Sequence, residues 1–257
     1  MRTFNYLFGI LAVLLMATGC GKDDEPETNT NTEAPVFNLK KSSAVEAVDL
    51  GLSVMWSNCN LGASSPRDYG GYFAWGDPSG ALWSGEGIGY NDSGYTWNTD
   101  NYGGNNPPAN ISGGSLDVVT AHWGDGWRMP TEAEMIDLAT KCEWTLLEQS
   151  GKKWFEVKGP NGHSIAMPIA GMYGDDPENH KSRFLSGPMH TNNTAFYWTS
   201  TVSWKQDQQF RGYFVNPGVV TSWAFLFTYG EDNSEFYYAF RDHLRAFHMS
   251  ILPVKDK

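Results

Sequence analysis

The chain has 257 residues, with 29 acidic against 18 basic side chains and a formal net charge of −11. Because contacts with phosphate groups need a basic face, this charge argues against a nucleic-acid-binding protein, and against a domain that holds an anionic membrane surface through a polybasic patch. Charged residues make up only 18% of the chain and aromatic residues 14%, with 28 glycines, which indicates many short strands and loops around one sizeable core.

The N-terminal residues have the pattern of an export signal. Arg2 precedes an apolar run at residues 7–16, which is too short for a membrane-spanning helix of ~20 residues. Small residues then end at Cys20, an arrangement that resembles a bacterial lipobox. We therefore expect residues 1–19 to be removed and Cys20 to carry lipid. The alternative is an ordinary signal peptide with an incidental cysteine.

An acidic linker follows. Residues 21–25 combine one lysine with three acidic residues and resemble the signal that sends Bacteroidota lipoproteins to the outer face of the outer membrane; the alternative is the solvated start of a linker. Residues 26–35 contain no aromatic side chain and cannot bury enough apolar area to offset the entropy of ordering. We expect a disordered tether over residues 20–42 and a folded domain over residues 43–257.

Short strands and loops are predicted in the first half of the domain. Residues 45–60 alternate apolar and polar positions, which predicts one or two strands, and residues 68–77 predict an aromatic strand bounded by glycine. Residues 80–114 form a long Gly/Asn/Pro-rich loop, of a length that is usually functional or ordered by its own side chains. Residues 116–123 fit a short helix.

The clearest helix begins after Pro130. Thr131 and Glu134 have the spacing of a capping box. The apolar side chains that follow recur at i, i+3, i+4 and i+7 and predict one buried stripe: Met135, Leu138, Ala139 and Cys142. Cys142 therefore faces the core, which suits either a disulfide with Cys59 or a plain buried thiol.

The pattern returns to strands beyond the helix. Residues 154–157 and 164–167 flank a glycine-containing turn and predict a hairpin. After a further loop at residues 170–194, we expect closing strands in three segments: residues 196–202, 223–228 and 246–254.

Several strings of residues, in one order along the chain, carry a resemblance to a known family. They are VDLGLSVMW (48–56) with CNLGA (59–63), YFAWGD (72–77), GDGWRMPT (124–131), FYWTS (196–200) and SILPV (250–254). Together they resemble the Fibrobacter succinogenes major paralogous domain family, which is common among surface lipoproteins of Bacteroidota. The resemblance implies an α+β, C-type lectin-like fold of short antiparallel strands, about two helices and long irregular loops. It also implies that the first and last strands lie close together.

The chain departs from the family pattern in two places. Leu252 stands where the family usually has an arginine, and residues 204–221 look inserted. The inserted segment is either a loop that sets ligand specificity or a hairpin extension that covers its own apolar residues.

Catalysis has little support in the sequence. The formylglycine-generating relatives of this family use reactive cysteines near the C-terminal end, and no cysteine follows Cys142. The histidines are dispersed, no Gly-x-Ser-x-Gly elbow occurs, and no spacing indicates paired carboxylates for glycoside cleavage. The calcium-binding strings of related lectins are missing too, so we expect no metal and no cofactor. The alternative is calcium, for which the acidic turn at residues 175–179 offers oxygen ligands.

The sequence favours a binding surface. Sugars and peptides are commonly held by aromatic platforms with a few placed polar groups. The C-terminal part, where lectin-like relatives bind, holds the candidates: Trp204, Arg211, Tyr213, Trp223, Tyr237, Tyr238 and Arg241. We expect them to form the binding loops of a non-enzymatic recognition module for a glycan or protein ligand, with Trp223 alternatively in the core. Two other functions stay open, a divergent glycan-processing enzyme and a structural cell-envelope or adhesin component.

Overall fold

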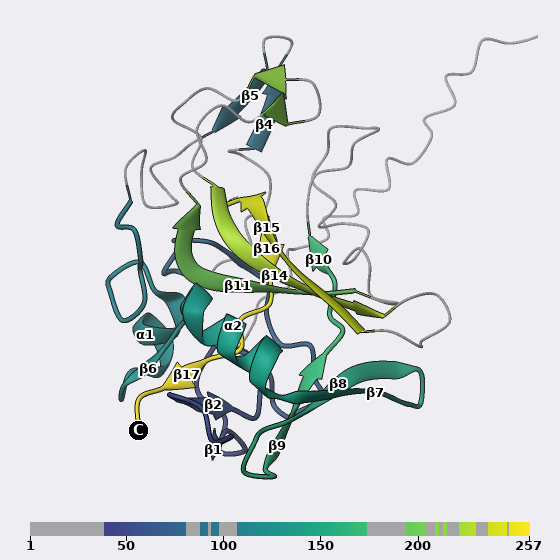
Figure 1. The fold of residues 1–257 in the computed structure, drawn as a ribbon. Coiled ribbons are helices and arrows are strands. Elements are labelled where there is room, and N and C mark those ends of the chain that lie inside the picture. The colour runs from purple at the N-terminus through teal and green to yellow at the C-terminus, as the bar shows by residue number, and fades with distance from the viewer. Residues whose placement is uncertain are drawn as a thin grey trace, which may run out of the picture. The chain divides into compact units, whose positions relative to one another are not determined.

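The computed structural model describes residues 39–80, 88–91, 94–97, 107–173, 194–203, 209–210, 213–214, 221–229, 236–245 and 247–257. Within these ranges the chain forms two α-helices and many short β-strands, and every strand pair in its sheets is antiparallel (Figure 1). The expected α+β class is confirmed. Neither helix in the described ranges has the length and apolarity needed to cross a lipid bilayer.

One sheet joins the beginning of the domain to its end. Its strand order is β1-β2-β17-β6, with these bounds: β1 Ala47–Asp49, β2 Met55–Ser57, β17 Val254–Lys255 and β6 Trp127–Arg128. β1 and β2 confirm the strands predicted in residues 45–60. Trp56 of β2 lies opposite Val254 of β17, so strands from the two ends of the domain are neighbours, as the family resemblance implies.

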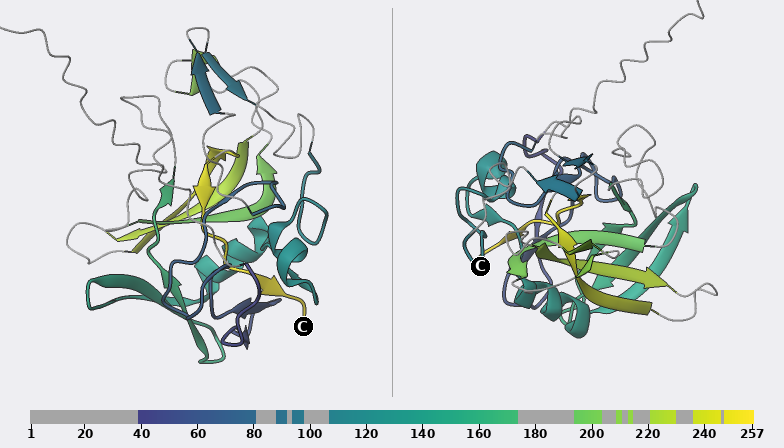
Figure 2. Two further views of the ribbon diagram at one scale, coloured as in Figure 1. Left: turned by 180° about the vertical axis from the view of Figure 1, so that it is seen from behind. Right: turned by 90° about the horizontal axis from the view of Figure 1, so that it is seen from above.

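Two further sheets contain the remaining C-terminal strands. The smaller one has the order β10-β16-β3, with these bounds: Met172–Tyr173, His248–Met249 and Phe73–Ala74. The larger one has the order β11-β14-β15, with these bounds: Thr194–Ser203, Thr221–Tyr229 and Phe236–Leu244. Its three long strands run side by side in both views of Figure 2. The sequence predicted β11 and β14 and missed β15.

The fourth sheet follows the second helix. Its order is β7-β8-β9, with these bounds: Glu143–Gln149, Lys152–Lys158 and Ser164–Pro168. The predicted β8–β9 hairpin is confirmed, whereas β7 was missed. β7 turns into β8 through Ser150 and Gly151, both with positive φ.

Two isolated hairpins lie in segments that we expected to be irregular. β4 (Ile88–Asn91) pairs with β5 (Gly94–Trp97) inside the predicted long loop. β12 (Gln209–Phe210) pairs with β13 (Tyr213–Phe214) inside the segment that departs from the family pattern. The second pairing agrees with the hairpin interpretation of that segment's backbone.

Both predicted helices are present. Asp117 caps α1 (Val118–Trp123). At the start of α2 (Glu132–Lys141), the Thr131 hydroxyl accepts a hydrogen bond from the Glu134 amide at 3.3 Å, and the Glu134 carboxylate accepts one from the Thr131 amide at 2.8 Å. The capping box is therefore confirmed, as is the stripe that follows it: Met135, Leu138 and Ala139 are buried, and Cys142 is half-buried.

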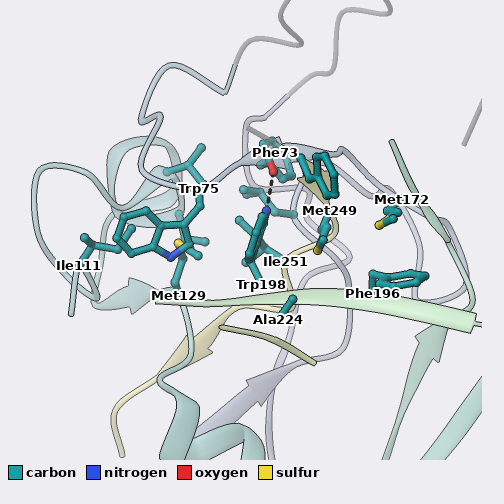
Figure 3. Packing of buried hydrophobic residues seen from close by; sticks show 14 of the residues in the cluster. Phe73, Trp75, Ile111, Met129, Met172, Phe196, Trp198, Ala224, Met249 and Ile251 are labelled. Atoms are coloured by element: carbon teal, nitrogen blue, oxygen red, sulfur yellow. Dashed lines mark hydrogen bonds between the residues drawn. The ribbon is translucent and has the colours of Figure 1, made fainter. Parts of the chain in front are cut away.

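Two groups of buried side chains form the core, and β11 lies between them. Phe196 and Trp198 belong to the first group, part of which Figure 3 shows. Ala195 and Tyr197 belong to the second group, which also contains Phe155 and Val157 of β8 and buried residues of α2 and β9. Because successive strand residues point to opposite faces, one strand packs into both groups.

The folded part begins before residue 43, where we expected the domain to start. Leu39 is only 8% exposed and belongs to the first core group. Its carbonyl oxygen accepts a hydrogen bond from the buried indole N–H of Trp123 at 3.0 Å. The segment preceding β1 therefore contributes to the core.

Candidate functional site

The strings that carry the family resemblance meet in the interior of the domain. The indole N–H of Trp198 donates to the carbonyl oxygen of Phe73 at 2.8 Å (Figure 3), and that of Trp75 donates to the carbonyl oxygen of Thr199, also at 2.8 Å. These buried bonds join two of the strings reciprocally. The two strings therefore help to fix the packing of the domain core.

A third string enters this interior through Asn60. Its side-chain amide donates to the Tyr197 hydroxyl at 3.2 Å, and the hydroxyl donates to the carbonyl oxygen of Pro168 at 2.9 Å. Burial raises the pKa of the Tyr197 hydroxyl, so it stays protonated and keeps its role as a donor.

Arg128 links Glu134, at the start of α2, to Asp256. Its Nη1 donates to Oε2 of Glu134 at 3.0 Å, and its Nη2 donates to Oε1 of Glu134 and to Oδ1 of Asp256, both at 2.7 Å. Burial is the largest single influence and by itself would raise the pKa of the Glu134 carboxyl, but the hydrogen bonds and charge of Arg128, together with the hydrogen bonds from Thr131, lower the pKa overall. Because the hydrogen-bonding groups and opposite charges of Arg128 and Glu134 are paired with each other, this network has a structural role.

Cys59 and Cys142, whose pairing the sequence left open, are both free thiols. Cys59 is buried, and Cys142 packs half-buried against the second core group. Burial raises the pKa of each thiol to about 11, with a smaller contribution from the nearby carboxylates of Asp68 and Asp137, respectively. Almost all of each thiol therefore stays protonated at neutral pH and is a poor nucleophile.

The predicted ligand-binding residues lie on strands wherever the structure describes them. Tyr213 belongs to β13, Trp223 to β14, and three residues belong to β15: Tyr237, Tyr238 and Arg241. This corrects the expectation of C-terminal binding loops. β15 pairs with β14 along its whole length, and aromatic residues such as those of β15 are common in strands.

Tyr238 is the member of this set whose side-chain exposure the structure describes. Its side chain is 43% exposed, and Phe227 is its partner in the strand register. Four other predictions lie outside the described residues: Cys20, the turn at residues 175–179, Trp204 and Arg211.

A pocket of about 420 Å³ lies on the outer face of the β7–β8–β9 sheet. The strand register places two rows of residues on this face, one of Leu147, Trp154 and Pro168, and one of Thr145, Glu156 and Ala166. Phe155 and Val157, the alternate residues of β8, enter the second core group. Strand alternation thus gives the sheet one buried face and one face that lines the pocket.

The turn at residues 65–67 forms the facing wall of this pocket. The Arg67 guanidinium lies 4.2 Å from the centre of the Trp154 ring, and its Nη1 donates to Oε1 of Gln149 at 2.7 Å. An ion pair between Lys152 Nζ and Asp68 Oδ1, at 3.5 Å, fastens the same turn to the β7–β8 hairpin. These contacts hold the exposed Arg67 guanidinium over the Trp154 ring, which is itself only 6% exposed.

The pocket carries an excess of negative charge. Its lining contains two carboxylates, Glu46 and Glu156, and one cation, Arg67. Across the part of the chain that the structure describes, neither carboxylate forms an ion pair; Glu156 Oε1 accepts a hydrogen bond from the Ser164 hydroxyl at 3.5 Å. The Arg67 guanidinium is hydrogen-bonded to the neutral side-chain amide of Gln149 and lies over the ring of Trp154. The arrangement suits a neutral or cationic ligand better than an anion.

Sequence reasoning did not select this pocket. Trp154 was predicted only as a residue of a strand, although the alternation along β8 could have marked it and Glu156 as members of an outer face. Because the sequence analysis did not predict β7, it could not predict that Leu147 of β7 lines the pocket. No local pattern places Arg67 over Trp154, since the two residues are far apart in the sequence.

In the described ranges, no group of three His, Cys, Asp or Glu side chains is placed to hold a metal ion. Comparison of the chain with models of protein families, with curated proteins and with solved structures found no match.

Proposed function

We propose that this protein is a lipid-anchored recognition module that binds a glycan or protein ligand in the pocket at Trp154. The observation that carries the proposal is an open pocket of about 420 Å³ whose lining combines apolar side chains with placed polar groups, and to which Trp154, only 6% exposed under Arg67, contributes. Pockets that hold small ligands have volumes of roughly 300–1,000 Å³ and such a mixed lining.

The proposed fold is C-type lectin-like. Its support is the combination of short antiparallel strands, two helices in the described ranges, and adjacent strands from the two ends of the domain. The interlocking of the family-like strings through the indole groups of Trp75 and Trp198 adds to this support. Membership of the Fibrobacter succinogenes major paralogous domain family is part of the same proposal.

The proposed location is the outer face of the outer membrane. The support is the lipobox-like sequence ending at Cys20 and the lysine-containing acidic segment at residues 21–25. A lipid on Cys20 would hold the domain at the surface without a membrane-spanning segment. The pocket would then face ligands outside the cell.

The test uses a variant that fills the pocket whatever the ligand is. Ala166 lines the pocket, and Thr145 lies on the other side of Glu156 in the same cross-strand row, outside the lining. Protein produced from the full chain and kept in mild detergent is screened against a glycan array and a panel of extracellular proteins, with calcium and with a chelator. We expect Ala166→Phe to abolish a specific signal and Thr145→Phe to preserve it.

Each other outcome contradicts part of the proposal. A signal that survives Ala166→Phe but is lost in Tyr238→Ala would move the site to the β11–β14–β15 sheet. Turnover of a bound glycan that stops in both Glu46→Gln and Glu156→Gln would favour a glycan-processing enzyme. Dependence on calcium would direct attention to residues 175–179, and a blank under both conditions would favour a structural envelope component.

A further inference from the structure

We infer that Asn161 is a site of self-modification, at which the chain converts its own asparagine to aspartate or isoaspartate without an enzyme. The inference does not depend on the proposed function. It is carried by the residue that follows Asn161, by the exposed turn in which the two residues lie, and by the hydrogen bonds of the Asn161 side chain.

The chemistry needs only the side-chain amide, the next backbone amide and water. The backbone nitrogen of Gly162 attacks Cγ of Asn161, a C–N bond forms, and the side-chain nitrogen leaves as ammonia with the proton of the attacking amide. One water molecule then opens the five-membered succinimide at either of its two carbonyl carbons. Opening at one carbon gives aspartate, and opening at the other gives isoaspartate, whose main chain runs through the side chain. Reactions of this kind make asparagine a thermolabile residue.

Glycine is the following residue that obstructs the attack least. A side chain after the asparagine crowds the attacking nitrogen, and glycine has none. Asn161 is the only asparagine in the chain that precedes a glycine. Both residues are exposed, and a Cβ built on Gly162 would meet nothing within 4 Å, so the turn projects into open space. The sequence therefore provides one preferred asparagine, and the fold exposes it to water.

The folded turn restrains the reaction. The Gly162 N–H, which has to attack, donates to the carbonyl oxygen of Gly159 at 2.9 Å. The leaving nitrogen, Nδ2 of Asn161, donates to the carbonyl oxygen of Asp49 at 2.7 Å, and Oδ1 accepts from the His163 amide at 3.2 Å. Both reacting groups are held, so the attack requires the turn to open. Local opening of an exposed turn costs less free energy than global unfolding, which makes the reaction accessible to the folded protein.

The reaction removes a hydrogen bond between this turn and β1. Asp49 is the last residue of β1, and its carbonyl oxygen accepts from Asn161 Nδ2. A carboxylate has no N–H to donate, so either product sets two acceptors against each other. Isoaspartate also lengthens the main chain by one carbon immediately before β9. Because residues 164–166 of β9 line the candidate pocket, the modification acts at one wall of that pocket.

The experiment is peptide mapping of the full-chain protein by mass spectrometry. The protein is incubated for several weeks at pH 8, folded in one series and in urea in another, and fragmentation distinguishes aspartate from isoaspartate. We expect Asn161 to convert ahead of every other asparagine in both series. Conversion should be about ten-fold faster in urea, because unfolding breaks the hydrogen bonds that hold the reacting groups. In urea, where the positive φ of Gly162 no longer matters, Gly162→Ala should remove the lead of Asn161.

A matched pair of variants tests the consequence for the fold. Asn161→Asp imitates one product and loses the donor to Asp49. Asn110→Asp is the control, because Asn110 is also exposed and accepts through Oδ1 from the Ser112 amide at 2.9 Å, a bond that a carboxylate keeps. We expect Asn161→Asp to lower the urea midpoint and to speed hydrogen exchange of the Gly162 amide about five-fold, and Asn110→Asp to change neither.

The outcomes that contradict the inference are specific. An unmodified Asn161 at the end of the folded incubation, or earlier conversion of another asparagine, would overturn the site. Equal rates in the folded protein and in urea would overturn the restraint by the turn. Equal urea midpoints for the two aspartate variants would overturn the loss of a stabilising contact with β1. None of these measurements uses a ligand, so they leave the proposed function to its own test.

Discussion

Removing the carboxylate of Asp117 should destabilise the fold more than any surface change. Both of its oxygens are buried and together accept four backbone hydrogen bonds. Oδ1 accepts from the amides of Val119 at 2.8 Å and Thr120 at 3.2 Å, and Oδ2 from those of Gly113 at 2.9 Å and Met129 at 2.8 Å. One side chain thus caps α1 and holds the segment that leads from β6 into α2.

The magnitude follows from the donors that would be left without a partner. The hydrogen bonds to Val119 and Met129 are buried, and those to Gly113 and Thr120 are partly buried. A buried donor without an acceptor costs about 1–3 kcal/mol, and loss of a helix cap costs about 1 kcal/mol. We expect Asp117→Ala to lower the free energy of unfolding by about 4 kcal/mol, a large part of the roughly 5–15 kcal/mol of a typical domain.

The assay is urea unfolding followed by tryptophan fluorescence. Asp117→Asn keeps the shape but replaces one acceptor oxygen with a donor, so we expect it to cost about 2 kcal/mol. The control is Asp125→Asn, since the Asp125 side chain is 80% exposed and asparagine tolerates its positive φ. The control should stay within about 0.5 kcal/mol of the parent protein. A cost below about 1 kcal/mol for Asp117→Ala, with an unchanged slope against urea, would refute the reasoning.

Three further predictions concern charge, thiols and backbone packing. Because the hydrogen bonds from Arg128 lower the pKa of Glu134 in the folded state, Glu134→Gln should cost about 2 kcal/mol at pH 7. That difference should shrink as the pH falls below about 4.3, where the carboxyl of the unfolded chain becomes protonated, and urea unfolding between pH 7 and pH 3 measures it; a constant difference would contradict the assignment. Cys59 and Cys142, whose pKa values burial raises to about 11, should resist iodoacetamide at pH 8 and react in urea, as intact mass shows; rapid labelling of the folded protein would be the opposite result. Gly159→Ala would place a methyl group against the carbonyl oxygen of a buried leucine and should lower the free energy of unfolding by about 2 kcal/mol, whereas an unchanged urea midpoint would show that the backbone yields.

The sequence analysis expected loops in the C-terminal part, and the structure has strands there. Aromatic content drew attention to the C-terminal residues, but Tyr237, Tyr238 and Arg241 lie on a nine-residue strand that the sequence analysis did not predict. Aromatic side chains serve a strand in a sheet and a ligand-binding loop equally well, so their presence alone does not choose between the two. In the structure these residues pair with β14, so they belong to a strand.

Local rules explain what the sequence determined by itself. The capping box of Thr131 and Glu134 and the stripe beginning at Met135 are spaced by helix geometry, which depends only on neighbouring residues. The alternation around Trp56 depends on the strand period in the same way and predicted β1 and β2. Composition and charge likewise needed no coordinates to argue against a nucleic-acid-binding protein.

The pocket and the state of the cysteines depend on contacts between segments that are distant in the sequence. Only the folded chain brings Arg67 over Trp154 and places Glu46 and Glu156 around one pocket, because these residues come from separate strands and turns. The same holds for Cys59, whose state as a free thiol depends on whether another cysteine lies within reach. A periodic pattern specifies which face of an element is buried, but tertiary packing specifies what covers the other face, and in this protein the candidate pocket lies on such a face.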